Sequence, residues 1–408
     1  MSVVIVGTLD TKAEEIGFAR DVIAAQGVDV HVVDVGVMGE PGFDPDTAAG
    51  EVAEAAGTTL ESLREEGERG EAMEAMGEGA AAIAQRLHEE GTLKGVLGLG
   101  GSGNTSIATT AMRALPVGVP KLMVSTMASG DTEPYVGAKD VTMMYSVADI
   151  EGLNRLSRRV IANAALAMVG MVTNDADVDV DERPTVALTM FGVTTPCVQT
   201  AREWLEERGY ETIVFHATGT GGRAMEALIR QGVVDGVLDV TTTEWADELV
   251  GGVLAAGEDR LDAAAETGVP QVVSVGALDM VNFGPRDSVP EEFEGRQFHI
   301  HNPQVTLMRT TPEENAQLGE IVAGKLNDAT GPTALALPLG GVSMLDTEGE
   351  DFHDPDADAA LFDALRDNLD DDVELIEYDG NINDDAFAER IAATLDEYMR
   401  EAGVGPSE

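Results

Sequence analysis

Residues 98–105, Gly-Leu-Gly-Gly-Ser-Gly-Asn-Thr, constrain the fold of this chain most strongly. They follow the short apolar run 95–97 and precede a helical pattern over residues 105–115. A strand, a glycine-rich loop and a helix in this order are typical of an α/β domain that binds phosphate, because backbone N–H groups and the helix dipole both face the anion. The candidate ligand-binding residues of this loop are Gly100, Gly101, Ser102, Gly103, Asn104 and Thr105.

Two known phosphate-binding motifs match this loop only in part. Gly98, Gly100 and Gly103 satisfy the dinucleotide pattern G-x-G-x-x-G, but the next strand, Lys121–Thr126, does not end in the acidic residue that holds a ribose. Gly98 and Gly103 also have the spacing of a P-loop, but Asn104 stands where that motif requires lysine. A turn that merely needs glycine is the alternative. The loop predicts a site without naming its ligand.

The two halves of the chain repeat one α/β plan. Four strand-like runs of the first half have counterparts in the second, beginning near residues 3, 28, 95 and 119 and near residues 185, 211, 236 and 269. Their common order indicates an internal duplication. Because short apolar strands alternate with amphipathic helices, we expect two Rossmann-like domains with parallel sheets and a cleft between them. The predicted domains are residues 1–172 and 185–408, joined by an acidic linker at 173–184.

The chain is strongly acidic. Its 408 residues include 75 Asp and Glu against 25 Lys and Arg, a net charge of −50, and only five of the cations are lysine. An acid excess with little lysine is typical of proteins that keep a hydrated surface in very high salt, and we expect a halophilic protein. The field of this charge repels nucleic acid and anionic lipid, so neither is expected as a partner. An anionic ligand needs a local cation or metal.

The compartment of the protein and the redox state of its cysteine are inferred from features that the sequence lacks. No run of about 18 apolar residues suggests a membrane span, and the first residues enter a strand-like run without the features of a signal peptide. The single cysteine, Cys197, excludes an intramolecular disulfide, and we expect a cytoplasmic protein. A buried, inert thiol is the favoured interpretation of Cys197 over a nucleophile.

A second candidate loop follows the first strand. It contains Thr8, Asp10, Thr11 and Lys12. Lys12, at the start of a helix, can supply the phosphate-binding cation that the glycine loop lacks, and Asp10 can hold Mg²⁺. A helix cap formed by Asp10 or Thr11 is the alternative. The turn after the strand that ends near residue 126 adds three residues that can line the same pocket, Ser129, Gly130 and Asp131.

The second half carries histidine, acid and glycine in loops expected at the carboxyl edge of its sheet. His216 precedes a glycine nest at 219–222, Asp279 follows a later strand, and His301 shares one face of an extended segment with His299. His216, Asp279 and His301 are the candidate catalytic residues, as acid–base groups or ligands in a second polar pocket. Their spacing matches no recognised metal motif, so hydrogen-bonding histidines are the alternative and the metal stays unknown.

Seven motifs in a fixed order resemble those of a known family. The motifs lie at residues 7–12, 98–103, 127–131, 143–146, 190–196, 216–222 and 301–306. The chain resembles an uncharacterised family of two-domain proteins that includes the N-terminal ATP-binding domain of the tomato mosaic virus resistance protein. The resemblance covers nearly the whole chain and implies two Rossmann-like domains, ATP as ligand and a homodimer.

Three functions stay open at this point. The first is an ATP-binding protein that transfers a phosphoryl or nucleotidyl group to a small metabolite with Mg²⁺. The second is a metal-dependent enzyme whose active site lies in the second domain. The third is a binding module without catalytic activity whose domains close on a small molecule.

The charge generates a first prediction. Self-repulsion between carboxylates destabilises the folded state at low ionic strength, whereas molar KCl shortens the screening length to about 3 Å. We therefore expect the melting temperature to rise between about 0.05 M and 2 M KCl, as followed by circular dichroism. A melting temperature that stays constant or falls over this range contradicts the halophilic interpretation.

Overall fold

The computed structural model describes residues 1–65, 69–174 and 183–406. Its contacts divide the chain into two compact units, residues 1–179 and 180–408. Helix α7 (Arg155–Thr173) is the last element of the first unit and strand β6 (Thr185–Met190) is the first of the second. These bounds lie close to the predicted limits of 172 and 185, while most of the predicted linker, residues 175–182, lies outside the described residues. Among the described helices, none combines the length and hydropathy needed to cross a bilayer.

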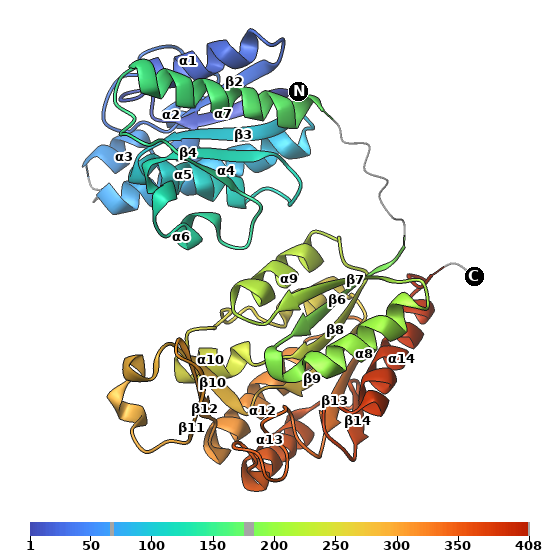
Figure 1. Ribbon diagram of the computed structural model, residues 1–408. Helices are drawn as coiled ribbons and strands as arrows, with labels where there is room; N and C mark the ends of the chain where they lie inside the picture. The colour runs from blue at the N-terminus through green and yellow to red at the C-terminus, as the bar shows by residue number, and fades with distance from the viewer. Residues whose placement is uncertain (66–68, 175–182, 407–408) are drawn as a thin grey trace. The chain divides into compact units, whose positions relative to one another are not determined.

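The N-terminal domain contains a parallel sheet of five strands between two layers of helices (Figure 1). The strands are β1 (Ser2–Gly7), β2 (Asp29–Asp34), β3 (Leu93–Gly100), β4 (Lys121–Ser125) and β5 (Thr142–Tyr145). They pair in the order β2-β1-β3-β4-β5, and every pair is parallel. The strand order reverses between β1 and β3, which is where doubly wound sheets bind ligands.

The helices of this domain cover both faces of the sheet. They are α1 (Ala13–Ala24), α2 (Ala49–Ala55), α3 (Leu60–Glu65), α4 (Arg69–Glu89), α5 (Ser102–Arg113), α6 (Glu133–Val136) and α7, with a 3₁₀ turn at Thr126–Ser129. Helices α1 and α7 bury Ile16 and Ile161 in one cluster, and α4 and α5 bury Met76 and Met112 in another.

The C-terminal domain contains a parallel sheet of six strands. They are β6, β7 (Glu211–His216), β8 (Gly236–Thr241), β9 (Gln271–Gly276), β13 (Thr333–Pro338) and β14 (Glu374–Tyr378), in the order β14-β13-β9-β8-β6-β7. Its first five strands repeat the 2-1-3-4-5 order of the N-terminal sheet, which supports the predicted duplication. Two parallel sheets in separate domains confirm the α/β, Rossmann-like fold class. The cleft between the domains stays a prediction.

The C-terminal domain also contains a small antiparallel sheet that the sequence did not predict. It lies between β9 and β13 in the chain and consists of β10 (Met280–Phe283), β12 (Val305–Arg309) and β11 (Phe298–Asn302), in that order. Short 3₁₀ turns at Arg286–Ser288 and Glu291–Phe293 connect β10 to β11. This insertion carries His299 and His301 on β11, in a sheet separate from the six-stranded one.

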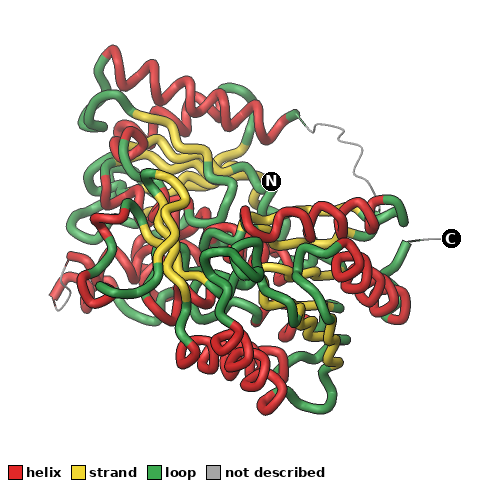
Figure 2. Tube along the Cα trace, turned by 60° about the horizontal axis from the view of Figure 1, so that its bottom comes forward, coloured by secondary structure: helices red, strands yellow, loops and turns green. Residues whose placement is uncertain are grey.

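Helices again cover both faces of the large sheet, and Figure 2 shows its strands lying between them. They are α8 (Thr195–Glu206), α9 (Thr220–Arg230), α10 (Glu244–Val250), α11 (Asp262–Thr267), α12 (Pro312–Asn327), α13 (Pro355–Asn368) and α14 (Asp385–Glu401), with a 3₁₀ turn at Gly192–Thr194. Helices α8 and α14 share one core cluster, and α12 and α13 pack into another beneath the antiparallel sheet.

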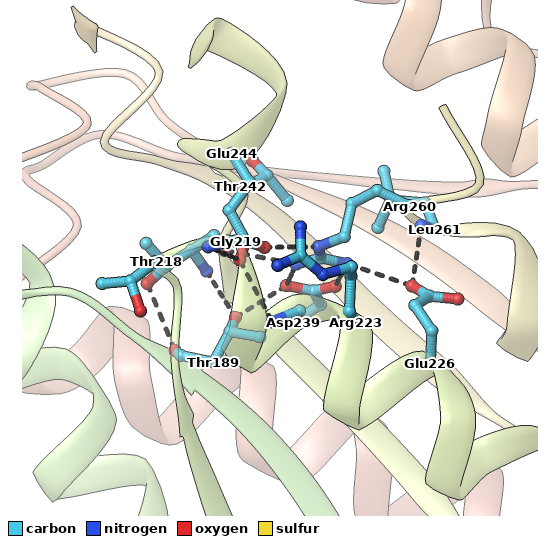
Figure 3. A network of polar contacts seen from close by, with 12 residues as sticks. Thr189, Thr218, Gly219, Arg223, Glu226, Asp239, Thr242, Glu244, Arg260 and Leu261 are labelled. Carbon is cyan, nitrogen blue, oxygen red and sulfur yellow. Dashed lines mark hydrogen bonds and ion pairs between the residues drawn. The ribbon is translucent and has the colours of Figure 1, made fainter. Parts of the chain in front are cut away.

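A buried arginine connects three elements of this domain (Figure 3). Arg260, which is 1% exposed, binds Asp239 of β8 with two nitrogens at 2.5 and 2.8 Å. The same guanidinium lies 2.7 Å from Glu244 of α10 and 3.3 Å from Glu226 of α9. Burial raises the pKa of Glu226, whereas the charge of Arg260 and the N–H groups of residues 261 and 263 lower it. One cation therefore compensates three buried carboxyl groups.

This arrangement generates a second prediction. Arg260→Met leaves buried carboxylates without their counter-charge, and we expect it to lower the free energy of unfolding by about 3–5 kcal/mol. Arg202→Met is the matched control, because Arg202 is half-exposed and pairs with Glu206 on the same helix, and it should cost less than about 1 kcal/mol. Guanidinium unfolding in molar KCl measures both variants. Equal stabilities of the two variants would contradict the role given to Arg260.

Candidate functional site

A cavity of about 630 Å³ opens at the carboxyl ends of β1 and β3. The loops that follow these two strands supply most of its polar lining, and Arg64 of α3 and Asp149 after β5 supply the rest, so the structure brings both predicted loops together. The polar lining residues are Thr8, Asp10, Thr11, Lys12, Arg64, Ser102, Asn104 and Asp149, with Gly100, Gly101 and Gly103 between them. The apolar lining residues, here called the apolar wall, are Val35, Val37, Met38, Leu63, Ala72, Met73 and Ile107.

Two helices begin at the polar side. Helix α1 starts at Ala13 and α5 at Ser102, directly after cavity-lining residues of each loop. The first N–H groups that bond within these helices are those of Ile16 and Thr105. They donate to the carbonyls of Lys12 and Gly101 at 3.0 and 2.9 Å. The N–H groups that precede them in each first turn have no partner within the helix. Both ends carry partial positive charge and favour an anion.

The glycine residues of the second loop are of two kinds. A Cβ on Gly100 would lie 2.7 Å from the Cβ of Asn104, so the fold itself requires glycine there. At Gly101 and Gly103 the nearest atoms would lie at 3.8 and 3.6 Å, which is ordinary contact distance. The fold therefore leaves room for a side chain at these two positions, which face the cavity. Glycine there suits the close approach of a ligand to the backbone.

Asn104 and Thr105 hold the loop in place. The Nδ2 of Asn104 donates to the carbonyls of Leu99 and Val6, the penultimate residues of β3 and β1, at 2.6 and 3.4 Å, while its Oδ1 is buried and has no partner in the described part of the chain. The hydroxyl of Thr105 donates to the carbonyl of Gly101 at 2.8 Å and lies 2.6 Å from the Oγ of Ser125. Thr105 is fully buried and does not line the cavity, contrary to its predicted contact with the ligand.

Lys12 is the N-cap residue of α1 and lines the cavity. Its backbone N–H donates to the carbonyl of Thr8 at 2.8 Å, and the hydroxyls of Thr8 and Thr11 lie 2.9 Å apart. No side chain caps α1, so the cap by Asp10 or Thr11 that was the alternative does not form. Within residues 1–65, 69–174 and 183–406, no ion pair involves Lys12. Its ammonium group is available to an anion.

Asp10 and Asp149 bring two carboxyl groups to the cavity. The Oδ2 of Asp10 accepts hydrogen bonds from the N–H groups of Met38 and Gly39 at 3.0 and 3.1 Å. Its Oδ1 is buried and lacks a partner among the described residues. Asp149, which sequence reasoning missed, follows β5 and accepts from the N–H of Ile150. Mg²⁺ is commonly held by one or two carboxylates together with phosphate oxygens, and this donor set fits it.

Asp34 ends β2 at the position where dinucleotide-binding domains hold a ribose. It is buried, and its Oδ1 accepts from the N–H groups of Leu9 and Gly36, both at 2.9 Å. Burial raises the pKa of Asp34, and these two hydrogen bonds oppose the shift. Because its carboxylate is committed to the backbone and does not line the cavity, Asp34 is not available to ribose hydroxyls.

The turn at 129–131 does not reach the cavity, contrary to the prediction. Ser129 ends a 3₁₀ turn, and Ser129, Gly130 and Asp131 are absent from the cavity lining. The Oδ1 of Asp131 accepts from the N–H of Glu133 at 3.1 Å, at the start of the short helix α6. These residues form the ordinary turn that was the alternative.

The glycine nest of the second domain is filled by the protein itself. The N–H groups of Gly219 and Gly222 both donate to the Oε1 of Glu244, at 2.7 and 3.0 Å. Glu244 is fully buried and also binds Arg260. The sequence predicted an anion at this nest, and the anion is an internal carboxylate.

The three candidate catalytic residues of this domain have different surroundings. His216 is exposed and stacks on Phe191 with 5.5 Å between ring centroids, and His301 is exposed on β11. Asp279 is buried, its Oδ2 accepts from Ser343, and burial together with Asp346 raises its pKa to about 7. No contact in the described part of the chain joins two of the three, and their catalytic role stays a prediction.

The described residues contain neither a cluster of three or more metal-binding side chains nor a reactive thiol. No group of three or more His, Cys, Asp and Glu side chains there is arranged to hold a metal ion. Cys197 is buried, and burial raises the pKa of its thiol well above the usual value. A thiol in this state is a poor nucleophile, which supports the inert interpretation.

Comparison with known proteins places the chain in a family. The N-terminal domain of the uncharacterised protein family UPF0261 matches residues 1–177, and its C-terminal domain matches residues 183–399. A UPF0261 protein of Clostridium tetani is 55% identical over 96% of this chain and 98% of its own length. One from Mesorhizobium japonicum is 48% identical over 96% and 98%. The ToMV resistance protein Tm-1(GCR237) of Solanum lycopersicum is 48% identical over 78% of this chain and 43% of its own length.

These matches confirm the resemblance inferred from the seven motifs, including its link to the tomato resistance protein. They cover both described domains in the expected order. The chain therefore belongs to the UPF0261 family.

Proposed function

We propose that the N-terminal domain binds ATP with Mg²⁺ in the cavity between β1 and β3. The observation that carries this proposal is the convergence of two loops, each leading into a helix, on one cavity at the reversal of strand order. Family resemblance to the tomato protein points to the same ligand. The proposal assigns the phosphates to the polar side and the base to the apolar wall.

The polar side suits a triphosphate. Two helix N-termini, the hydroxyls of Thr8, Thr11 and Ser102, and the ammonium group of Lys12 are donors directed to one region. The chain carries a net charge of −50, which opposes the entry of any anion, so local donors must supply the whole attraction. Backbone N–H groups act at short range, where bulk screening is weak.

The apolar wall suits a purine base. Ligand cavities are lined mainly by apolar side chains with a few placed polar groups, and this cavity is lined by both kinds of residue. A dinucleotide is disfavoured because Asp34 is committed to backbone N–H groups. A nucleoside triphosphate fits the combination of one anion site, one apolar wall and no free ribose-binding acid.

The chemistry open to this site is transfer of a phosphoryl or nucleotidyl group to a small molecule. Such catalysis consists mainly of positioning and charge neutralisation. Mg²⁺, held by Asp10 and Asp149, supplies charge neutralisation at the phosphates when bound. Lys12 and the helix N-termini orient the anion. A binding module without turnover is the second reading, and measurement of ATP hydrolysis or transfer separates the two.

The loop chemistry generates a third prediction. Gly101→Val places a branched side chain where the ligand approaches the backbone, and it should abolish ATP binding without unfolding the domain. Lys12→Ala should weaken binding by about 1.5–3 kcal/mol, the scale of a charge-assisted hydrogen bond. Isothermal calorimetry in molar KCl measures both.

The matched controls are Gly192→Val and Lys94→Ala. Gly192 has open space around its Cβ position, and Lys94 is an exposed lysine at the opposite end of β3. Both controls should bind ATP like the wild type. Wild-type affinity in Gly101→Val and Lys12→Ala together would place the nucleotide elsewhere.

The two carboxyl groups generate a fourth prediction. Mg²⁺ should raise the affinity of the wild type for ATP, and Asp149→Asn should remove most of this gain because it replaces a charged ligand by a neutral one. ATP affinity measured with and without Mg²⁺ tests this. Asp131→Asn, at an acid that does not line the cavity, is the control and should keep the full gain. An unchanged Mg²⁺ effect in Asp149→Asn would remove this residue from the site.

A further inference from the structure

We infer that the cavity accepts purine nucleoside triphosphates without distinguishing adenine from guanine. This inference rests on the proposed nucleotide site and concerns how the apolar wall treats the base. Its basis is the chemistry of the side chains in the wall and the hydrogen bonds of the backbone after β2 and of Arg64.

The side chains of the wall offer a base a surface without strong hydrogen-bonding groups. All seven are valine, leucine, isoleucine, alanine or methionine. Val37, Leu63 and Met73 are partly buried and pack against the core cluster that also contains Ile107. Residues from four separate elements thus form one supported surface. A flat ring can be buried against it by the hydrophobic effect alone.

The backbone N–H groups beside the wall are already used. After β2, the N–H of Gly36 donates to Asp34, and those of Met38 and Gly39 donate to Asp10. The N–H of Val35 donates to the carbonyl at the end of β1 at 3.0 Å. Backbone N–H groups in such a loop commonly read the ring nitrogens of a base. Of the five backbone N–H groups of residues 35–39, four donate to acceptors of the protein itself.

Arg64 is the cationic side chain beside the wall. Its Nε donates to the carbonyl of Val37 at 2.5 Å, and its Nη2 lies 3.5 Å from the carbonyl of Gly39. The guanidinium thus holds the loop after β2 against α3. These contacts direct the Nε and Nη2 of Arg64 to the protein backbone.

The consequence concerns discrimination. A site built to hydrogen-bond a substrate group rejects an analogue that lacks it by about 10⁴-fold or more, whereas an apolar pocket discriminates weakly between molecules of the same shape. Adenine and guanine share the same fused rings and differ in their hydrogen-bonding edges. The apolar wall contacts the fused rings and forms no hydrogen bond to the edges in which the two bases differ.

The experiment compares three ligands on the full chain by calorimetry in molar KCl with Mg²⁺. We expect ATP and GTP to bind within about fivefold of each other, and inorganic triphosphate to bind at least about tenfold more weakly than either. Met73→Ala should weaken ATP and GTP by the same factor and leave inorganic triphosphate unchanged. Met171→Ala, at an exposed methionine of α7, is the control and should change none of the three affinities.

Each outcome has one meaning. A preference of more than about fiftyfold for either nucleotide overturns the inference while leaving the nucleotide site intact. A Met73→Ala effect on one nucleotide alone overturns it as well, because it reveals a base-specific contact. Inorganic triphosphate that binds as tightly as both nucleotides shows that the wall does not hold the base. If none of the three ligands binds, the proposed function itself fails.

Discussion

The close approach of α5 to β3 is the constraint on which the rest of the N-terminal site depends. A Cβ on Gly98 would lie 2.8 Å from that of Ala108, and one on Gly100 would lie 2.7 Å from that of Asn104. Because glycine has only a hydrogen in place of a side chain at both positions, α5 packs closely against the end of β3. Residues at its start then line the same cavity as Lys12 at the start of α1. Without this approach, the cavity would have one helix end instead of two.

Sequence reasoning found the polar side of the cavity and missed the apolar wall. Strand-loop-helix order and glycine spacing are local signals, so the loops at 8–12 and 100–104 could be predicted. Val35, Val37 and Met38 form no sequence motif. Leu63 and Met73, which line the same cavity, come from helices α3 and α4. Only tertiary packing brings them together. Thr105 and the turn at 129–131 failed for the converse reason, since hydroxyl and carboxyl groups serve turns and ligands equally well.

The two domains share one strand order but differ in what surrounds their glycine-rich turns. Both sheets share the order 2-1-3-4-5, and both have glycine-rich turns that open helices. In the second domain, the carboxylate of Glu244 occupies the nest, and Arg260 balances its charge. Side chains of the protein itself therefore stabilise this edge of the sheet. A sequence pattern cannot tell the two cases apart, because the N–H groups look identical whether a ligand or a side chain accepts from them. The partner is decided by residues distant in sequence.

The two oxygens of Asp10 differ in their hydrogen bonding, although both lie against the loop after β2. Oδ2 holds the N–H groups of Met38 and Gly39, which sit at the apolar wall, while Oδ1 is turned away from these partners and unpaired. A carboxylate is one rigid plane, so a rotation that improves one oxygen's contact disturbs the other's. Asp10 therefore ties the loop after β1 to the loop after β2 through a single side chain, and its two oxygens cannot be repositioned independently of each other.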